Sequence, residues 1–175
     1  MKDIWKVVER ATNVAVIVAV CLAAVFFYRT YRESQPEAPK VGATLPMLPG
    51  YGWQSNPQSL VLAIRKGCHF CEASMPFYRK LYDLEKSNAL KAKMIAVLPD
   101  SATDAFEVLS TQNLPMPFIS GANLSSLSVS GTPTLILVDR NGKVEKTWVG
   151  QLNSAGEESV LAATKNASQQ GRENF

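Results

Sequence analysis

The chain has 175 residues, of which 46% are apolar and 19% are charged. That composition supports a buried core and excludes a disordered polyelectrolyte. The formal net charge is only +3 and most of this excess lies in the first 35 residues, so the sequence lacks the basic face that a nucleic-acid partner requires. The single histidine and three cysteines exclude most multi-ligand zinc frameworks.

The first apolar segment predicts a membrane anchor. Residues 11–28 carry no charged side chain and lie between Arg10 and Arg29. As a helix they would be roughly 27 Å long, close to the thickness of the hydrocarbon core of a bilayer. We therefore expect a short N-terminal tail over residues 1–10 and an uncleaved, single-pass transmembrane anchor over residues 11–29.

A cleaved signal peptide is the alternative for this segment. Such a peptide ends in small residues at its cleavage site, whereas Phe26, Phe27 and Tyr28 occupy that place here. Basic side chains lie on both sides, three before the apolar run and two soon after it. This small difference favours a cytoplasmic N-terminus and a C-terminal domain outside the cytoplasm.

A polar linker and one domain follow. Residues 30–40 include two prolines and predict an extended spacer, and residues 41–175 form a single domain. Leu60–Ile64 is a short apolar run, typical of a strand buried on both faces. Helical spacing then runs from Cys68 to about Ser87, with Pro76 inside the helix.

The pattern of strand and helix then repeats. Met94–Leu98 predicts a second buried strand, and Ser101 with Asp104 three residues later predicts a capped helix start. Phe118 and Ile119 predict a short strand. The apolar positions expected for the intervening helix are Phe106, Val108 and Leu109.

The last part of the domain predicts a hairpin and a final helix. Residues 134–138 form a third buried strand, and the Asn-Gly pair within residues 139–142 is a hairpin signal. Residues 144–149 return antiparallel, and residues 154–165 form a helix. Strict alternation would place Val144, Lys146 and Trp148 on one face of the sheet. The order of elements predicts an α/β fold with a mixed sheet and helices packed on it.

The chemistry lies at the first helix of the domain, where Cys68-His69-Phe70-Cys71 follows a buried strand. The helix N-terminus favours a thiolate at Cys68 through its unpaired N–H groups and its dipole. Cys71 lies one turn further on, close enough to form a disulfide. His69 would tune the pKa of Cys68, because a positive charge beside the thiol lowers that pKa further.

Three other interpretations of the cysteine pair stay open. A zinc knuckle would need a second pair of ligands, and only His69 and Cys21 remain for it. A purely structural disulfide or two packed thiols would also fit the spacing. A dithiol redox centre fits best, because it also accounts for the position between strand and helix.

These residues resemble the thioredoxin-like family. Cys68-x-x-Cys71 with Pro76 five positions later resembles its active-site helix, and Gly131-Thr132-Pro133-Thr134 resembles its cis-proline loop. The apolar N-terminal segment and the stretch from Val41 to Pro46 look most like the membrane-tethered TlpA/ResA-like branch. The resemblance covers residues 41–165.

The resemblance implies a role for each matched residue. Cys68 would be the attacking thiolate and Cys71 the resolving thiol. Pro133 would be a cis-proline beside the sulfurs, and Thr132 would offer backbone hydrogen bonds to an extended substrate. The thiol chemistry would need no dissociable cofactor and no metal.

The sequence departs from the family at its carboxylates. A buried acid on the preceding strand is replaced by Leu62, and a glutamate of related reductases is replaced by Ser74, with Glu72 displaced to the helix surface. Those carboxylates help to move a proton from the resolving thiol, so their absence bears on the direction of electron flow.

We therefore expect a membrane-anchored thiol–disulfide oxidoreductase that faces the periplasmic side of a bacterial inner membrane. Its substrates would be proteins with cysteines or disulfides, and a transmembrane protein would donate or accept electrons. Reduction of an apocytochrome c during cytochrome c maturation is the client chemistry that the resemblance implies. The alternatives are a disulfide oxidant or isomerase, and a non-enzymatic module that binds peptides or a partner. A peroxidase is disfavoured, because Arg65 stands where that chemistry needs Ser or Thr.

Overall fold

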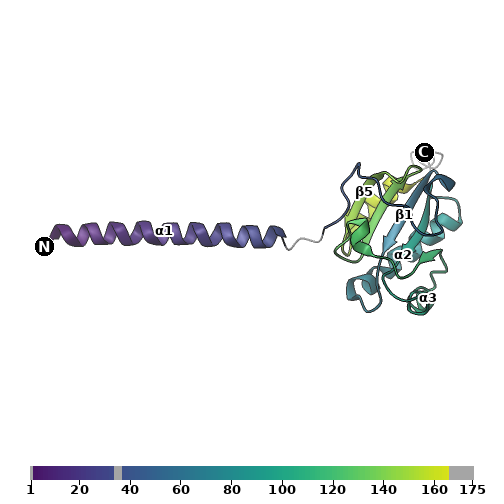
Figure 1. Cartoon of the computed structure of the whole chain (residues 1–175), viewed down its shortest axis with the longest axis horizontal. Coiled ribbons are helices and arrows are strands. Elements are labelled where there is room, and N and C mark those ends of the chain that lie inside the picture. The colour runs from purple at the N-terminus through teal and green to yellow at the C-terminus, as the bar shows by residue number, and fades with distance from the viewer. Residues whose placement is uncertain (1, 34–36, 166–175) are drawn as a thin grey trace. The chain divides into compact units, whose positions relative to one another are not determined.

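The computed structural model describes residues 2–33 and 37–165, and within the first helix it describes side chains only for residues 14–30. The chain forms two separate units, residues 1–35 and residues 36–175. In the first unit, α1 (Lys2–Glu33) is one long helix that includes the described part of the predicted tail (Figure 1).

Among the residues described in this way, no helix is both long and apolar enough to cross a membrane. The anchor expected over residues 11–29 includes residues 11–13, whose side chains lie outside the description. It therefore stays a prediction.

The domain is built on a five-stranded mixed sheet, which confirms the α/β fold expected from the sequence. Its strand order is β3-β2-β1-β4-β5, with β1 parallel to β2 and β2 parallel to β3, while β4 is antiparallel to both β1 and β5. The strands are Gln58–Ala63 (β1), Ala92–Val97 (β2), Phe118–Ile119 (β3), Thr134–Asp139 (β4) and Val144–Val149 (β5). Every residue of the central strand β1 is buried, which explains the apolar run that starts at Leu60.

Three α-helices contribute to the core on one face of the sheet. They are α2 (His69–Lys86), α3 (Ala102–Thr111) and α4 (Ser154–Thr164), and their buried apolar side chains belong to one cluster with Leu60 and Leu62. β1, β2 and β3 advance in one direction across the sheet, so right-handed crossovers bring α2 and α3 to the same face.

The other face of the sheet is covered mainly by loops and short 3₁₀ helices. A second cluster packs Leu45, Leu48 and Trp53 against the strands, together with Leu127 of η2 (Leu124–Leu127). Trp53 begins η1 (Trp53–Ser55). The segment before η1 is fixed to the hairpin by backbone bonds, including Leu45 N to Gly142 O at 2.9 Å. Each face of the sheet therefore carries a cluster of buried apolar side chains.

The prediction that Val144, Lys146 and Trp148 share one face of the sheet is wrong. Trp148 belongs to the core cluster on the helix side of the sheet, whereas Val144 belongs to the cluster on the opposite side. The cause is an irregularity between Leu137 and Val138, where the register with β5 shifts. A β-bulge adds one residue to one strand and so reverses the alternation beyond it.

The apolar side of α3 also differs from the expectation. Ala105 and Leu109 are buried, Val108 is half-buried, and Phe106 is 64% exposed. Residues four apart share a helix face, whereas Phe106 is rotated by about 100° from Ala105. The predicted cap is confirmed, because Ser101 Oγ accepts a hydrogen bond from Asp104 N at 3.2 Å.

The predicted linker over residues 30–40 is divided in the structure. Its first residues continue α1, and residues 34–36 lie outside the described residues. From Glu37 onward the chain bonds to the domain: Ser130 N donates to Glu37 O at 3.0 Å, and Thr147 Oγ1 donates to Pro39 O at 2.9 Å. The part of the described chain that is bonded to the domain therefore begins at Glu37, several residues before Val41.

Candidate active site

The cysteine pair lies at the end of β1, where the chain turns into α2. Gly67 takes a φ of +68°, a conformation that favours glycine, immediately before Cys68. Cys68 is the N-cap of α2, and its Sγ accepts a hydrogen bond from Cys71 N at 3.2 Å. The two cysteines form a disulfide with their Cα atoms 5.2 Å apart. Cys68 is 7% exposed and Cys71 only 1%, so Cys68 is the more accessible of the two cysteines.

A second loop meets this turn from the neighbouring strand. β1 and β4 are antiparallel, with Ala63 opposite Thr134, so the loop before β4 lies next to the loop after β1. The Thr132–Pro133 peptide bond is cis, as the resemblance implies. Thr132 Oγ1 donates to Cys68 Sγ at 3.4 Å, and the Thr132 carbonyl oxygen lies 3.5 Å from the same sulfur. The fold thus joins two motifs that are far apart in sequence.

A groove of about 760 Å³ lies along these two loops. Its lining includes Arg65 and residues 67–70 from the loop and start of α2, and residues 122–125 and 129–132 from the region of η2 and the cis-proline loop. Cys68 and Thr132 both line it, so a peptide in the groove would lie against Cys68 and beside the cis-proline loop. This is the arrangement needed for thiol–disulfide exchange with a protein substrate.

His69 lies at the rim of the site. Its side chain is exposed, and its ring packs edge-on against that of Phe70 with centroids 5.8 Å apart. Across the described chain the imidazole of His69 forms no hydrogen bond or ion pair, so the structure places His69 next to Cys68 without holding its ring against the sulfur. Its tuning role stays a prediction.

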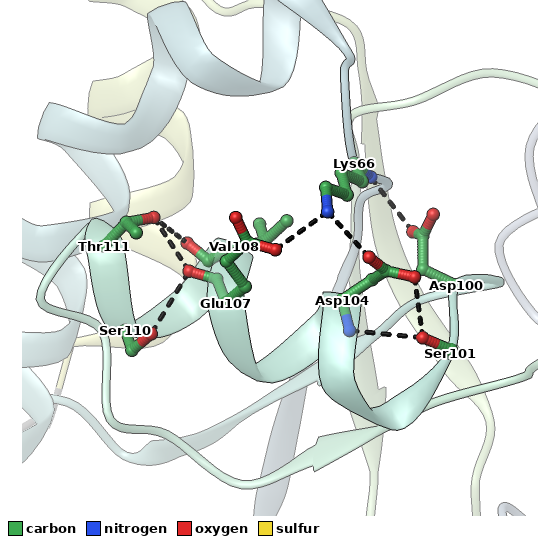
Figure 2. Close-up of polar contacts among 8 residues, drawn as sticks. All are labelled: Lys66, Asp100, Ser101, Asp104, Glu107, Val108, Ser110 and Thr111. Carbon is green, nitrogen blue, oxygen red and sulfur yellow. Dashed lines mark hydrogen bonds and ion pairs between the residues drawn. The ribbon is translucent and has the colours of Figure 1, made fainter.

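Figure 2 shows a charged network that the sequence did not indicate, just before the cysteine pair. Lys66 N donates to Asp100 Oδ2 at 2.9 Å, while Lys66 Nζ contacts Asp104 Oδ1 at 2.6 Å and Glu107 Oε2 at 2.8 Å. These bonds raise the pKa of Lys66 well above its ordinary value and lower that of Asp104. The network holds the active-site loop against α3, and its members are too far apart in sequence for spacing to reveal them.

The buried cysteine borders a second, smaller cavity. Its volume is about 170 Å³, and it lies between α2 and α3, lined by Cys71 together with Glu72 and Glu107. Leu62 and Ser74 stand at the two positions where the family resemblance implies carboxylates. Leu62 is fully buried in the core, and the hydroxyl of Ser74 donates to Phe70 O at 2.8 Å. Within the described chain, no group of three or more His, Cys, Asp or Glu side chains could hold a metal ion.

The class of protein follows from three features of this site: the more accessible Cys68, its buried partner Cys71 and the adjoining cis-proline loop. The protein is a thioredoxin-like thiol–disulfide oxidoreductase. The chain belongs to the Redoxin family, whose model matches residues 52–164. No curated protein matches the chain.

Solved structures of similar fold come from several bacteria. The thioredoxin domain of a thiol-disulfide oxidoreductase from Bacteroides vulgatus is 19% identical, with a TM-score of 0.56 over 72% of this chain and 98% of that one. A thiol:disulfide interchange protein from Bacteroides sp. is 19% identical, with a TM-score of 0.57 over 77% and 97%. StoA from Bacillus subtilis is 16% identical, with a TM-score of 0.51 over 71% and 98%. At identities this low, the structural likeness shows a shared fold and nothing more.

Proposed function

We propose that the protein reduces disulfides in extracytoplasmic client proteins, working from a membrane anchor. The proposal rests on one observation: Cys68 lines a peptide-sized groove beside Thr132, while Cys71 is buried behind it. The first sulfur can meet a protein substrate, and the second is protected from it. The resemblance to the TlpA/ResA-like branch supports the reducing direction.

The reduced protein carries out two exchanges. The Cys68 thiolate attacks one sulfur of the client disulfide, which breaks the client S–S bond and releases the other client sulfur as a thiolate. The Cys71 thiolate then attacks Cys68 Sγ, which frees the client and leaves the Cys68–Cys71 disulfide. Two electrons pass to the client, and a dithiol donor must return two electrons to the protein.

Local hydrogen bonds favour Cys68 as the attacking thiolate. Cys71 N and Thr132 Oγ1 both direct hydrogens at its sulfur, and hydrogen bonds to a charged form stabilise that form. The α2 N-terminus adds the positive end of a helix dipole. His69, one residue further on, would add positive charge when protonated.

The partners that we propose follow from this placement. A transmembrane protein with a dithiol would donate the electrons, and the clients would be unfolded chains with cysteines. An apocytochrome c, reduced during cytochrome c maturation, is such a client, and the family resemblance supports that choice.

We propose that α1 holds the protein in the inner membrane with the domain in the periplasm. All side chains described between Val14 and Tyr28 are exposed, and Phe27 is 70% exposed. Such a continuous apolar surface is unfavourable in water, and lipid would cover it. The basic residues before the run support a cytoplasmic N-terminus.

The reduction potential of the full chain in mild detergent tests the direction of electron flow. We expect a value near or below about −270 mV, as for thioredoxin, when the protein is equilibrated with a thiol buffer and its thiols are trapped. A value near about −120 mV, as for DsbA, would instead identify a disulfide oxidant. The missing carboxylates at Leu62 and Ser74 favour that alternative, and 30 mV corresponds to about 1.4 kcal/mol.

Replacing one cysteine or the other should impair the exchange reaction in different ways. Cys71→Ser should accumulate a mixed disulfide between Cys68 and the client, because the resolving thiol is gone, whereas Cys68→Ser should neither reduce nor trap a client. Non-reducing electrophoresis with a disulfide-bonded client separates these species. Equal activity of Cys68→Ser and the native protein would favour a non-enzymatic binding module.

A further inference from the structure

The groove beside Cys68 is lined by basic residues but by no described acidic residue. Among the described residues that line it, Arg65 is the one with a permanent charge, His69 is the other ionisable group besides the cysteine, and none is Asp or Glu. The opposite wall is formed mainly by small, polar or apolar residues such as Asn123, Ser125 and Ser130. The described lining of the groove therefore places one cation and no carboxylate against a bound peptide.

Arg65 is unpaired in the described chain, in contrast to its neighbour Lys66. Lys66 binds both Asp104 and Glu107, and these carboxylates are thus occupied (Figure 2). Glu72 and Glu107 line the smaller cavity together with Arg65, but neither lies within ion-pair distance of its guanidinium. Arg65 is exposed, so its charge faces the solvent at the edge of the groove.

We propose that the groove selects client segments with an acidic residue beside the reacting cysteine, and that Arg65 recognises this residue. The inference rests on the proposed function and specifies its substrate class. A guanidinium presents paired N–H donors that match a carboxylate, which makes Arg65 a suited partner. Phe70, 57% exposed in the same groove, would cover an apolar neighbour of that acid. The exchange step itself is unchanged, with a dithiol as the electron source.

Three peptides test the proposal with the full chain in detergent, reduced beforehand by dithiothreitol that is then removed. Each peptide carries one cysteine in a mixed disulfide with 2-mercaptoethanol, and they differ only in a neighbouring Asp, Asn or Lys. Stopped-flow measurement of the exchange gives a second-order rate constant for each. The rate of each peptide with free dithiothreitol corrects for the intrinsic reactivity of its disulfide.

For the native protein we expect the corrected rate of the Asp peptide to exceed that of the Asn peptide about two- to fivefold, in the range of an exposed ion pair. The Lys peptide should be the slowest, and about 0.5 M salt should reduce the differences. Arg65→Gln should remove the preference, Arg65→Glu should reverse it, and Arg65→Lys should retain part of it.

Arg140→Gln is the matched control. Arg140 is exposed and follows β4, at the end of the sheet opposite the cysteines because β4 is antiparallel to β1. It should keep the native preference. Equal corrected rates for all three peptides, or the same preference in Arg65→Gln, would overturn the inference while leaving the proposed function intact. Failure to react with any peptide would instead contradict the proposed function.

Discussion

Cys68 depends on residues that come from a distant part of the chain. Its sulfur receives one hydrogen bond from Cys71 N, within its own turn, and another from Thr132 Oγ1, across the sheet. The local bond follows from the N-cap position, which any helix N-terminus would provide. The bond from Thr132 requires β1 and β4 to be neighbours. The reactivity of one side chain is therefore set by both local and tertiary structure.

Tyr78 provides a pH test of the core behind the active site. It is 1% exposed in the cluster with Cys71 and Met75, and burial raises its pKa to about 12 from an ordinary value of 10.0. Since the folded pKa is the higher one, its neutral form stabilises the fold fully below about pH 10. This contribution, about 2–3 kcal/mol, is lost as the pH rises toward 12.

Urea unfolding of the native protein and Tyr78→Phe at a series of alkaline pH values measures this effect. The free energy of unfolding should fall more steeply for the native protein than for Tyr78→Phe, because the phenylalanine has no proton to lose. Other groups that titrate in this range are the same in both proteins. Parallel pH dependences would contradict the assigned burial effect.

The loop between β1 and α2 is the element that presents the cysteines, and its neighbours hold it at both ends. β1 is buried between β2 and β4, and α2 packs Phe77, Tyr78 and Leu81 into the core. Between these two anchors Lys66 bonds to Asp104 and Glu107 of α3 and to Asp100, which lies just before that helix. The cysteines therefore lie on a rigid support, which is the usual arrangement for a functional loop.

A substitution in the β4–β5 hairpin can test how closely Trp53 packs on the face of the sheet opposite the helices. Gly142 has a φ of +78°, and a Cβ atom there would lie 2.7 Å from Trp53 Cδ1. Gly142→Ala combines a left-handed conformation with this clash, so we expect it to lower the free energy of unfolding by about 2–4 kcal/mol.

Gly121→Ala is the control for that substitution. Gly121 has a similar φ of +63°, but no atom lies within 4 Å of an added Cβ. It should therefore cost only about 1–2 kcal/mol, the conformational part alone. Equal costs for the two variants in urea unfolding would show that Trp53 does not pack tightly against the hairpin.

The whole molecule combines two separate units, the helix α1 and a compact oxidoreductase domain. The two core clusters contain residues from Leu45 onward, whereas the described side chains of α1 are exposed. The stability of the domain thus comes from its own sheet and helices. The proposed task of α1 is to place the groove near a membrane-bound electron donor.

Membrane extraction tests the proposal that α1 anchors the protein in the membrane. In a Gram-negative host the full chain should stay in the membrane fraction after an alkaline carbonate wash, whereas residues 36–175 alone should be soluble. The physical reason is the apolar surface between Val14 and Tyr28, which lipid would cover. Release of the full chain by the wash would overturn the proposed anchor.

Much of the fold and the cysteine site could be predicted from local patterns. β1, β2 and β4 are fully or almost fully buried, and each contains an apolar run of at least four residues. Ser101 and Asp104 mark the start of α3 by their capping pattern. Cys68 and Cys71 are three residues apart and need only one helical turn to meet. Such signals survive in a single sequence because propensity, capping and periodicity act over a few residues.

Tertiary structure decided the features that depend on long-range pairing. The bulge between Leu137 and Val138 placed Val144 and Trp148 on opposite faces, and no residue type announces it. The contacts of Lys66 with α3 and of Thr132 with Cys68 arise because the chain folds strands β2 and β4 onto either side of β1. Residue spacing carries no record of such contacts, since the separation in space is set by strand order and register across the whole sheet.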